Sequence, residues 1–118
     1  KYIAPVPIEA LIMGNSSVEQ VCVTGSQLKQ PIALVVLSED AQRQDKERLE
    51  KSLLDTLASV NSGLESHAVL DRLVIMKDDW TVENGLLTPT LKIKRHLLED
   101  KYEALINTPD KGQLIYQG

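Results

Sequence analysis

The chain has 118 residues, the size of one ordinary domain, and its 13 basic and 17 acidic residues give a net charge of −4. This acidic balance argues against a nucleic-acid-binding protein, because phosphate recognition usually requires an excess or a stripe of basic residues. A hydrophobic share of 42% with 25% charged residues excludes a disordered chain, and no apolar run approaches the roughly 20 residues that span a bilayer.

Aromatic residues are scarce, at 3% with no Phe, so Leu, Val and Ile must build the core. The single cysteine, Cys22, cannot form a disulfide framework. Its place on the more polar face of a predicted strand, with no His nearby in sequence, favours a packed side chain over a nucleophile. The chain begins with Lys rather than Met and opens in a Pro-containing stretch, so we interpret it as a fragment of a longer protein.

The first third of the chain predicts a loop, a short helix and two strands. Two prolines predict a stiff loop over residues 1–8, and a short helix follows over 8–13, ended by Gly14. Residues 18–24 alternate in polarity, which is typical of a strand with one buried face. Residues 32–37 are all apolar and indicate a central strand covered on both faces. Only a short turn joins the two strands, so we expect an antiparallel pair.

The middle of the chain predicts a helix and a third strand. Ser38 is suited to cap a helix, and leucines at helical spacing from Leu49 to Leu57 continue it until the Asn-Ser-Gly of residues 61–63. Residues 73–76 form a short apolar run that predicts a strand.

Asn84-Gly85 is a strong turn signal, because both residues tolerate positive φ angles. Leu98 and Tyr102 lie on one face of a last helix, which Pro109 ends. Together these patterns predict a small α+β domain with a three-stranded, mainly antiparallel sheet flanked by helices.

The segment WTVENGLLTPTLKIKR, residues 80–95, has the composition of a binding loop. After a proline-stiffened Thr-Pro-Thr come three cations, Lys92, Lys94 and Arg95, within four residues. Such a loop at a helix start suits anionic oxygens. On composition alone, such a cluster of cations is more often a solvated helix end than a binding site.

Two motifs resemble the AMP-forming adenylating superfamily, and within it the long-chain fatty acyl-CoA synthetases. KYIAPVPIE, residues 1–9, resembles the end of the hinge-and-loop motif that begins the C-terminal domain. NGLLTPTLKIKR, residues 84–95, resembles the long-chain form of the last motif, which holds the catalytic lysine. The intervening strand–strand–helix order also matches, so the resemblance covers nearly the whole chain.

The resemblance implies that residues 1–118 are the mobile C-terminal domain of an ATP-dependent fatty acid–CoA ligase, without its N-terminal domain. In this superfamily a carboxylate attacks the α-phosphate of ATP, giving acyl-AMP and pyrophosphate, and CoA then displaces AMP. The small domain swings between two orientations, one for each step. We expect ATP, Mg²⁺ and CoA to be bound mainly or partly by the absent domain, and the isolated fragment to be inactive. The resemblance also implies a cytoplasmic enzyme without a transmembrane segment, and peripheral membrane contact stays open.

Residue by residue, the resemblance implies that Lys92 enters the site for adenylation. A mobile ammonium would stabilise the meeting of a carboxylate and a triphosphate. Lys94 is the rival, but the lysine–aliphatic–x–arginine spacing favours Lys92. Many superfamily members carry Gly before this lysine, whereas Leu91 stands here, a departure that long-chain synthetases share. We expect Lys94 and Arg95 to be structural, at the start of the last helix.

The first motif implies a second group of site residues. Lys1, Tyr2, Ile3 and Ala4 match the loop that lines the CoA channel in the second orientation, with an ordinary covered segment as the alternative. Glu9 matches the acidic end of the motif, where we expect a helix cap or a structural hydrogen bond.

The remaining candidates favour structural roles. No metal site is expected, because His67 and His96 lie far apart and neither has a ligand spacing. Asp78 and Asp79 are interpreted as a solvated strand end rather than a magnesium site, since adjacent strand residues point to opposite faces. Trp80 is expected to anchor the packing or to belong to a docking surface.

Two alternatives remain open at this level. The same domain occurs in fatty acyl-AMP ligases and in carboxylic acid reductases, where carrier or reductase domains would follow. A free-standing α+β interaction module without chemistry is the third hypothesis.

Overall fold

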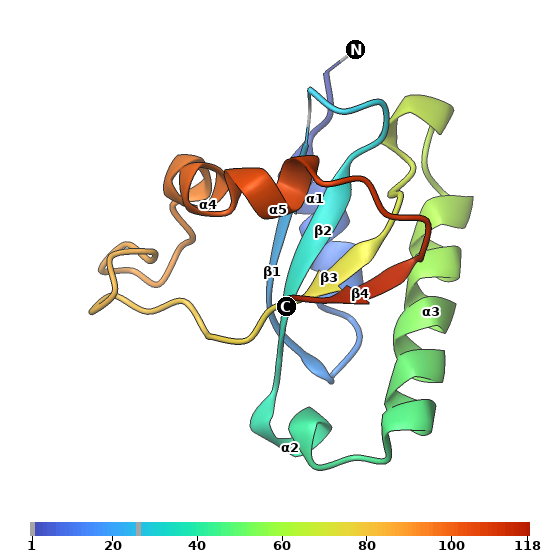
Figure 1. The fold of residues 1–118 in the computed structure, drawn as a ribbon, viewed down its shortest axis with the longest axis horizontal. Coiled ribbons are helices and arrows are strands. Elements are labelled where there is room, and N and C mark those ends of the chain that lie inside the picture. The colour runs from blue at the N-terminus through green and yellow to red at the C-terminus, as the bar shows by residue number, and fades with distance from the viewer. Residues whose placement is uncertain (1, 26) are drawn as a thin grey trace.

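The computed structural model describes residues 2–25 and 27–118, and its centre is a four-stranded sheet (Figure 1). The strands lie in the order β1-β2-β3-β4. Their bounds are Val18–Thr24 for β1, Ile32–Leu37 for β2, Leu73–Ile75 for β3 and Leu114–Tyr116 for β4. The pair β1–β2 is antiparallel, as predicted, whereas β2–β3 and β3–β4 are parallel.

The α+β class is confirmed, but the prediction of a three-stranded, mainly antiparallel sheet was wrong in strand number and direction. A long helix lies between β2 and β3 in the chain, and such a crossover lets two strands run parallel. The strand β4 has only three residues, partly buried or exposed, at the sheet edge. A strand this short leaves no alternation from which sequence can predict it.

Helices surround the sheet, and none of those in the described residues is both long and apolar enough to cross a membrane. Their bounds are Pro5–Ile12 for α1, Glu39–Gln42 for α2, Lys46–Ser62 for α3, Arg95–Lys101 for α4 and Glu103–Asn107 for α5, with a 3₁₀ turn at Ser66–Ala68.

Two helix boundaries differ from the predictions. The helix α1 begins at Pro5, so the loop predicted over residues 1–8 was wrong from Pro5 onward, because a proline in the first turn of a helix loses no hydrogen bond. The predicted cap at Ser38 is confirmed, since its side chain accepts the Ala41 amide at 3.1 Å. The helix that follows is broken, however, because Asp45 caps a new helix by accepting the Arg48 amide.

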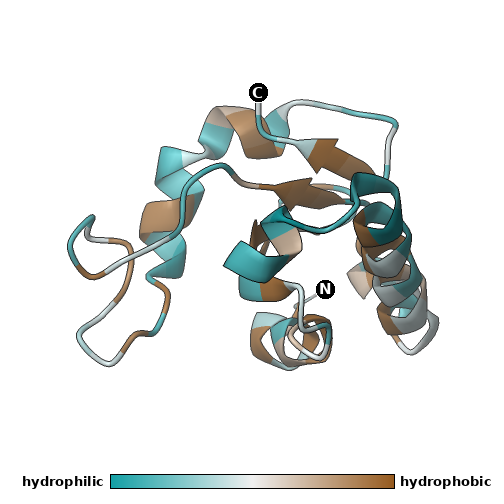
Figure 2. Cartoon of the chain, turned by 90° about the horizontal axis from the view of Figure 1, so that it is seen from below, coloured by the Kyte–Doolittle hydropathy of each residue, from teal (hydrophilic) through white to brown (hydrophobic). Residues whose placement is uncertain are grey.

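The core lies on both faces of the sheet (Figure 2). On one face, α1 and α3 pack against alternate residues of the strands. On the other, α4, α5 and the segment before α4 pack against the remaining strand residues. The covered central strand at 32–37 is therefore confirmed. The strand β1 was expected to have one buried face, but Val21–Thr24 are buried on both, because α4 covers the second face.

Candidate functional site

The segment between β3 and α4, residues 76–94, extends away from the sheet (Figure 1). Its start is anchored by Gln20 of β1, whose side-chain amide makes two hydrogen bonds of 2.8 Å with the backbone of Trp80. Trp80 is only 1% exposed and packs in the core with α4, which confirms the packing anchor and excludes a docking surface. Its indole Nε1–H has no hydrogen-bond partner among the described residues.

A turn centred on Asn84 reverses this segment. The Asn84 Oδ1 atom accepts the amides of Thr81 at 2.9 Å and Leu86 at 3.2 Å, and Gly85 has a φ of +81°. The predicted Asn-Gly turn is confirmed. It directs Leu86 and Leu87 into the core, where they are 6% and 7% exposed.

Beyond Leu87 the chain forms a short hairpin, defined here as residues 87–93. A bridge between Leu87 and Ile93 closes its base. Thr88 holds its tip at three points: its amide donates to the Lys92 carbonyl at 2.8 Å, its carbonyl accepts the Leu91 amide at 2.8 Å, and its Oγ1 accepts the Lys92 amide at 3.1 Å. The Thr-Pro-Thr pattern placed Thr88 in the predicted binding loop but did not predict that it supports the backbone of Lys92.

Leu91 closes the tip in a left-handed backbone conformation, with a φ of +66°. A turn followed by one left-handed residue is a regular way to close a short hairpin, and the left-handed position normally takes Gly. A residue with a Cβ pays about 1–2 kcal/mol there. The Leu that stands before Lys92 therefore occupies a position where Gly would be free of strain.

Lys92 is exposed on this hairpin. Within residues 2–25 and 27–118, no carboxylate lies within 4.0 Å of its ammonium group, as is also true of Lys94, whereas Arg95 has an acidic partner. The hairpin thus presents an uncompensated, flexible cation on a hydrogen-bonded support.

Lys94 and Arg95 have different surroundings from Lys92. Lys94 is half-buried and precedes α4, and its amide donates to the Leu86 carbonyl at 2.9 Å. Arg95 forms a two-point ion pair with Glu9 of α1 at 2.5 and 3.0 Å and also donates to the Val23 carbonyl at 2.9 Å. The hydrogen bond with Glu9 raises the pKa of Arg95, so this residue stays a cation.

Cys22 lies beside this ion pair, with its Sγ 3.6 Å from the Arg95 Nη1 atom. Burial raises the pKa of the Cys22 thiol to about 12, although the Arg95 charge acts in the opposite direction. The thiol is fully buried and neutral, which fits the predicted packed side chain rather than a nucleophile.

The N-terminal segment lies apart from the hairpin in both views (Figures 1 and 2). Lys1 lies outside the described residues. Tyr2 is 84% exposed, Ile3 packs against the core, and Ala4 precedes the first turn of α1. Glu9 does not cap this helix but accepts the Val23 amide at 2.8 Å and binds Arg95. The structure therefore brings Glu9 and Arg95 together.

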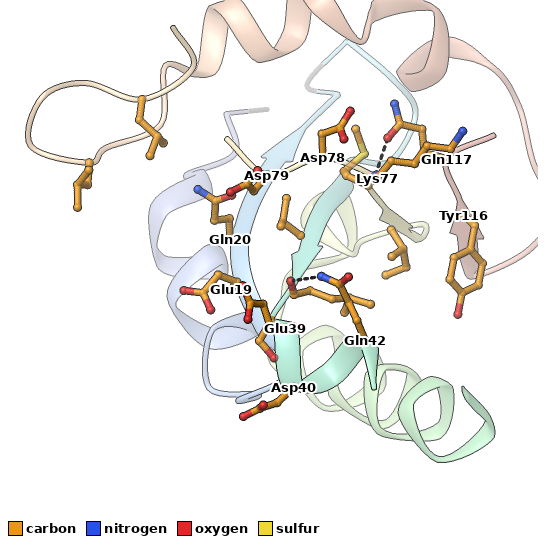
Figure 3. Close-up of a pocket in the computed structure, with 17 residues that line it drawn as sticks. Glu19, Gln20, Glu39, Asp40, Gln42, Lys77, Asp78, Asp79, Tyr116 and Gln117 are labelled. Atoms are coloured by element: carbon orange, nitrogen blue, oxygen red, sulfur yellow. Dashed lines mark hydrogen bonds between the residues drawn. The ribbon is translucent and has the colours of Figure 1, made fainter. Parts of the chain in front are cut away.

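An open groove of about 1140 Å³ lies beyond the carboxyl ends of β2, β3 and β4 (Figure 3). Its charged residues are Lys77 and five acids, namely Glu19, Glu39, Asp40, Asp78 and Asp79. Asp78 and Asp79 are exposed, as expected for a solvated strand end. Leu87 and Leu91 of the hairpin also line this groove. Because its acidic rim repels polyphosphates, the candidate site for anionic oxygens is Lys92 on the hairpin rather than the acidic part of the groove.

Comparison with known proteins identifies relatives over most of the chain. Residues 1–109 match the family described as "AMP-binding enzyme C-terminal domain". The chain is 32% identical to long-chain-fatty-acid–CoA ligase 6 of Mus musculus, with 90% of this chain aligned to 18% of the relative. It is also 32% identical to the chloroplastic long-chain-fatty-acid–[acyl-carrier-protein] ligase AEE15 of Arabidopsis thaliana, over 89% of this chain and 15% of the relative.

A solved structure shares the fold. The A-PCP didomain of a carboxylic acid reductase from Segniliparus rugosus, in complex with AMP, superposes with a TM-score of 0.74 at 29% identity, over 90% of this chain and 16% of that one. The chain therefore spans less than a fifth of the length of each of these proteins.

Proposed function

Because the chain belongs to the family of AMP-binding enzyme C-terminal domains, we propose that it is the mobile C-terminal domain of an ATP-dependent fatty acid–CoA ligase. In the first step an oxygen of the fatty acid carboxylate attacks the α-phosphorus of ATP, and pyrophosphate leaves. In the second step the CoA thiolate attacks the acyl carbon, and AMP leaves. We assign the nucleotide, the acid and Mg²⁺, which would neutralise the triphosphate, to a larger preceding domain, since the chain covers only 18% of its mouse relative.

The observation that carries this proposal is the exposed, uncompensated Lys92 on its hydrogen-bonded hairpin. In the first step, two anions must approach each other while negative charge builds on the phosphate oxygens. An ammonium group on a backbone that is already ordered can stabilise this negative charge electrostatically, because the hairpin need not reorganise during the reaction. Lys94 and Arg95 belong to the support, because one is half-buried at the helix start and the other is paired with Glu9.

The placement of the two motifs supports alternation between two orientations. The loop between β3 and α4, which carries the hairpin, and the N-terminal end of the chain lie at different edges of the domain (Figure 1), which supports their facing one active site in different orientations. We propose that Lys92 faces the site during adenylation and that Tyr2, Ile3 and Ala4, with Lys1 by resemblance, line the CoA channel during thioester formation.

Exposed apolar side chains on and next to α1 also support the proposal that this chain is part of a larger protein. Val6, Leu11 and the C-cap residue Met13 are 66%, 56% and 42% exposed, although Ile8 and Ile12 of the same helix are buried in the core. A helix that is apolar on all sides is normally covered on all sides. We propose that the larger domain covers these exposed side chains.

The decisive experiment separates the two half-reactions in the full-length parent ligase. Lys92→Ala should lower the rate of ATP–pyrophosphate exchange about 10²–10³-fold, the usual effect of removing one charge-stabilising donor. Thioester formation from supplied acyl-adenylate should be largely unchanged. Lys94→Ala is the matched control and should retain exchange. Equal loss of both half-reactions, or no loss, would contradict the role of Lys92.

A carrier protein is the second candidate acceptor. The plant relative is named as an acyl-carrier-protein ligase and has the same 32% identity as the mouse CoA ligase. The adenylation step would be the same with either acceptor, so Lys92 would keep its role. Comparing CoA with a carrier protein as acceptor for the adenylate formed by the full-length enzyme would decide between them.

A further inference from the structure

We propose that Leu91 is a positioning residue whose side chain packs against an apolar surface of the larger domain when the hairpin inserts, and so aims Lys92. This inference rests on the proposed function of Lys92.

The backbone of Leu91 is the first observation. With a φ of +66°, it is the single non-glycine residue with positive φ among the described residues. The conformation is set by the hairpin closure, because the Leu91 amide donates to the Thr88 carbonyl at 2.8 Å. Gly would adopt it without strain, and Asn would tolerate it better than a leucine does. The local backbone therefore disfavours the residue that stands there.

The side chain of Leu91 is the second observation. It is 69% exposed, belongs to neither core cluster and lines only the wall of the open groove. Packing within the described part of this chain thus does not compensate the strained backbone. Backbone strain that local packing leaves uncompensated points to a contact made in another state of the protein.

The position next to Lys92 indicates where that contact is made. Consecutive Cα atoms are about 3.8 Å apart, and the hydrogen bonds that Thr88 shares with Leu91 and Lys92 make the tip one rigid unit. The tip cannot insert Lys92 into a site on the larger domain without bringing Leu91 to the wall of that site. A side chain without polar atoms gains from such a contact only if the wall is apolar.

The test uses the full-length parent ligase and the variant Leu91→Gly. Removing the side chain relieves the strain, so the thermal midpoint of unfolding of the 118-residue domain should rise. The kcat of adenylation should fall roughly tenfold or more, as expected for a displaced catalytic group. The KM values for ATP and fatty acid, and thioester formation from supplied acyl-adenylate, should be unchanged.

Two further variants separate the side chain from the backbone. Leu91→Asn keeps a similar size in a left-handed position but is polar, so it should lose adenylation as Leu91→Gly does. Leu91→Met keeps an apolar side chain and should retain most of the activity. A merely structural role for Leu91 would instead make the more stable variants at least as active as the parent.

Each remaining outcome also decides the matter. Full adenylation activity in Leu91→Gly would overturn the inference. A loss that appears in the KM for the fatty acid and depends on its chain length would place Leu91 on the substrate and overturn the proposed wall. Lys92→Ala, measured in parallel, separates a failure of this inference from a failure of the proposed function. If Lys92→Ala abolishes adenylation while Leu91→Gly does not, only the inference about Leu91 fails. If Lys92→Ala is fully active, the proposed function itself fails.

Discussion

Glu9 and Arg95 form a two-point ion pair between residues 86 positions apart in the chain. The Glu9 carboxylate also accepts the Val23 amide, and the Arg95 guanidinium donates to the Val23 carbonyl. The helix α1, the edge strand β1 and the first residue of α4, which follows the hairpin that carries Lys92, are thereby joined in one network. Both side chains are largely shielded, with exposed fractions of 12% for Glu9 and 24% for Arg95.

We predict that breaking this pair from one side destabilises the domain. Arg95→Met should lower the free energy of unfolding by about 2–3 kcal/mol, because it leaves a shielded carboxylate without its charged donor. Urea unfolding of the 118-residue chain measures this. The double variant Glu9→Gln with Arg95→Met should lose less than the sum of the two single losses. Strict additivity would mean that the two side chains do not stabilise each other.

The buried thiol of Cys22 should make stability fall at alkaline pH. Burial raises its pKa from 9.0 to about 12 in the folded state, so between these values the unfolded thiol ionises while the folded one does not. Stability due to Cys22 is therefore fully present below about pH 9 and is lost as the pH rises toward 12.

Urea unfolding at pH 8 and pH 10 tests this, with Cys22→Ala as the reference. The parent chain should lose more stability between the two pH values than the variant. The thiol should also resist alkylation at pH 8 until the chain unfolds. Rapid alkylation of the folded chain would show that Cys22 is accessible and contradict the prediction.

Trp80 packs its ring in the core, but its indole N–H has no hydrogen-bond partner in residues 2–25 and 27–118. Trp80→Ala should cost about 3–5 kcal/mol through the cavity it leaves. Trp80→Phe should cost clearly less, because it keeps an aromatic ring and removes the buried donor, whose unmet hydrogen bond costs about 1–3 kcal/mol. Thermal and urea unfolding of both variants measure the difference. Equal losses would indicate that the indole N–H is satisfied in solution.

Thr88→Val should loosen the hairpin without unfolding the domain. The hydroxyl of Thr88 accepts the Lys92 amide at 3.1 Å, so its removal frees the backbone at Lys92. In the full-length ligase we expect adenylation to fall roughly three- to tenfold, with little change in the thermal midpoint of unfolding.

Thr90→Val is the matched control for this prediction. Its hydroxyl contacts that of Thr88 at 3.1 Å, but it makes no hydrogen bond to the Lys92 backbone within the described residues. It should therefore be the milder of the two variants. An equal effect of both would point to the polarity of the tip rather than to the support of Lys92.

The sequence by itself determined the elements whose signals are local. The alternation and apolar runs located β1, β2 and β3, Ser38 marked a helix start and Asn84-Gly85 marked a turn. The motif order predicted the family that the comparison then showed. These features depend on hydrophobic periodicity and on the backbone preferences of a few neighbouring residues. Both can be determined from the amino-acid sequence without the fold.

Only the tertiary structure decided the features that depend on distant partners. The parallel direction of β3, the three-residue strand β4, the pairing of Glu9 with Arg95 and the left-handed backbone of Leu91 all depend on which segments meet in space. A local sequence pattern does not predict such pairings, because many segments have the same local propensity. Which of them pair depends on the entropy of loop closure and on tertiary packing. The sequence thus identified Lys92 as a candidate catalytic residue, whereas the fold decided how Lys92 is supported and presented.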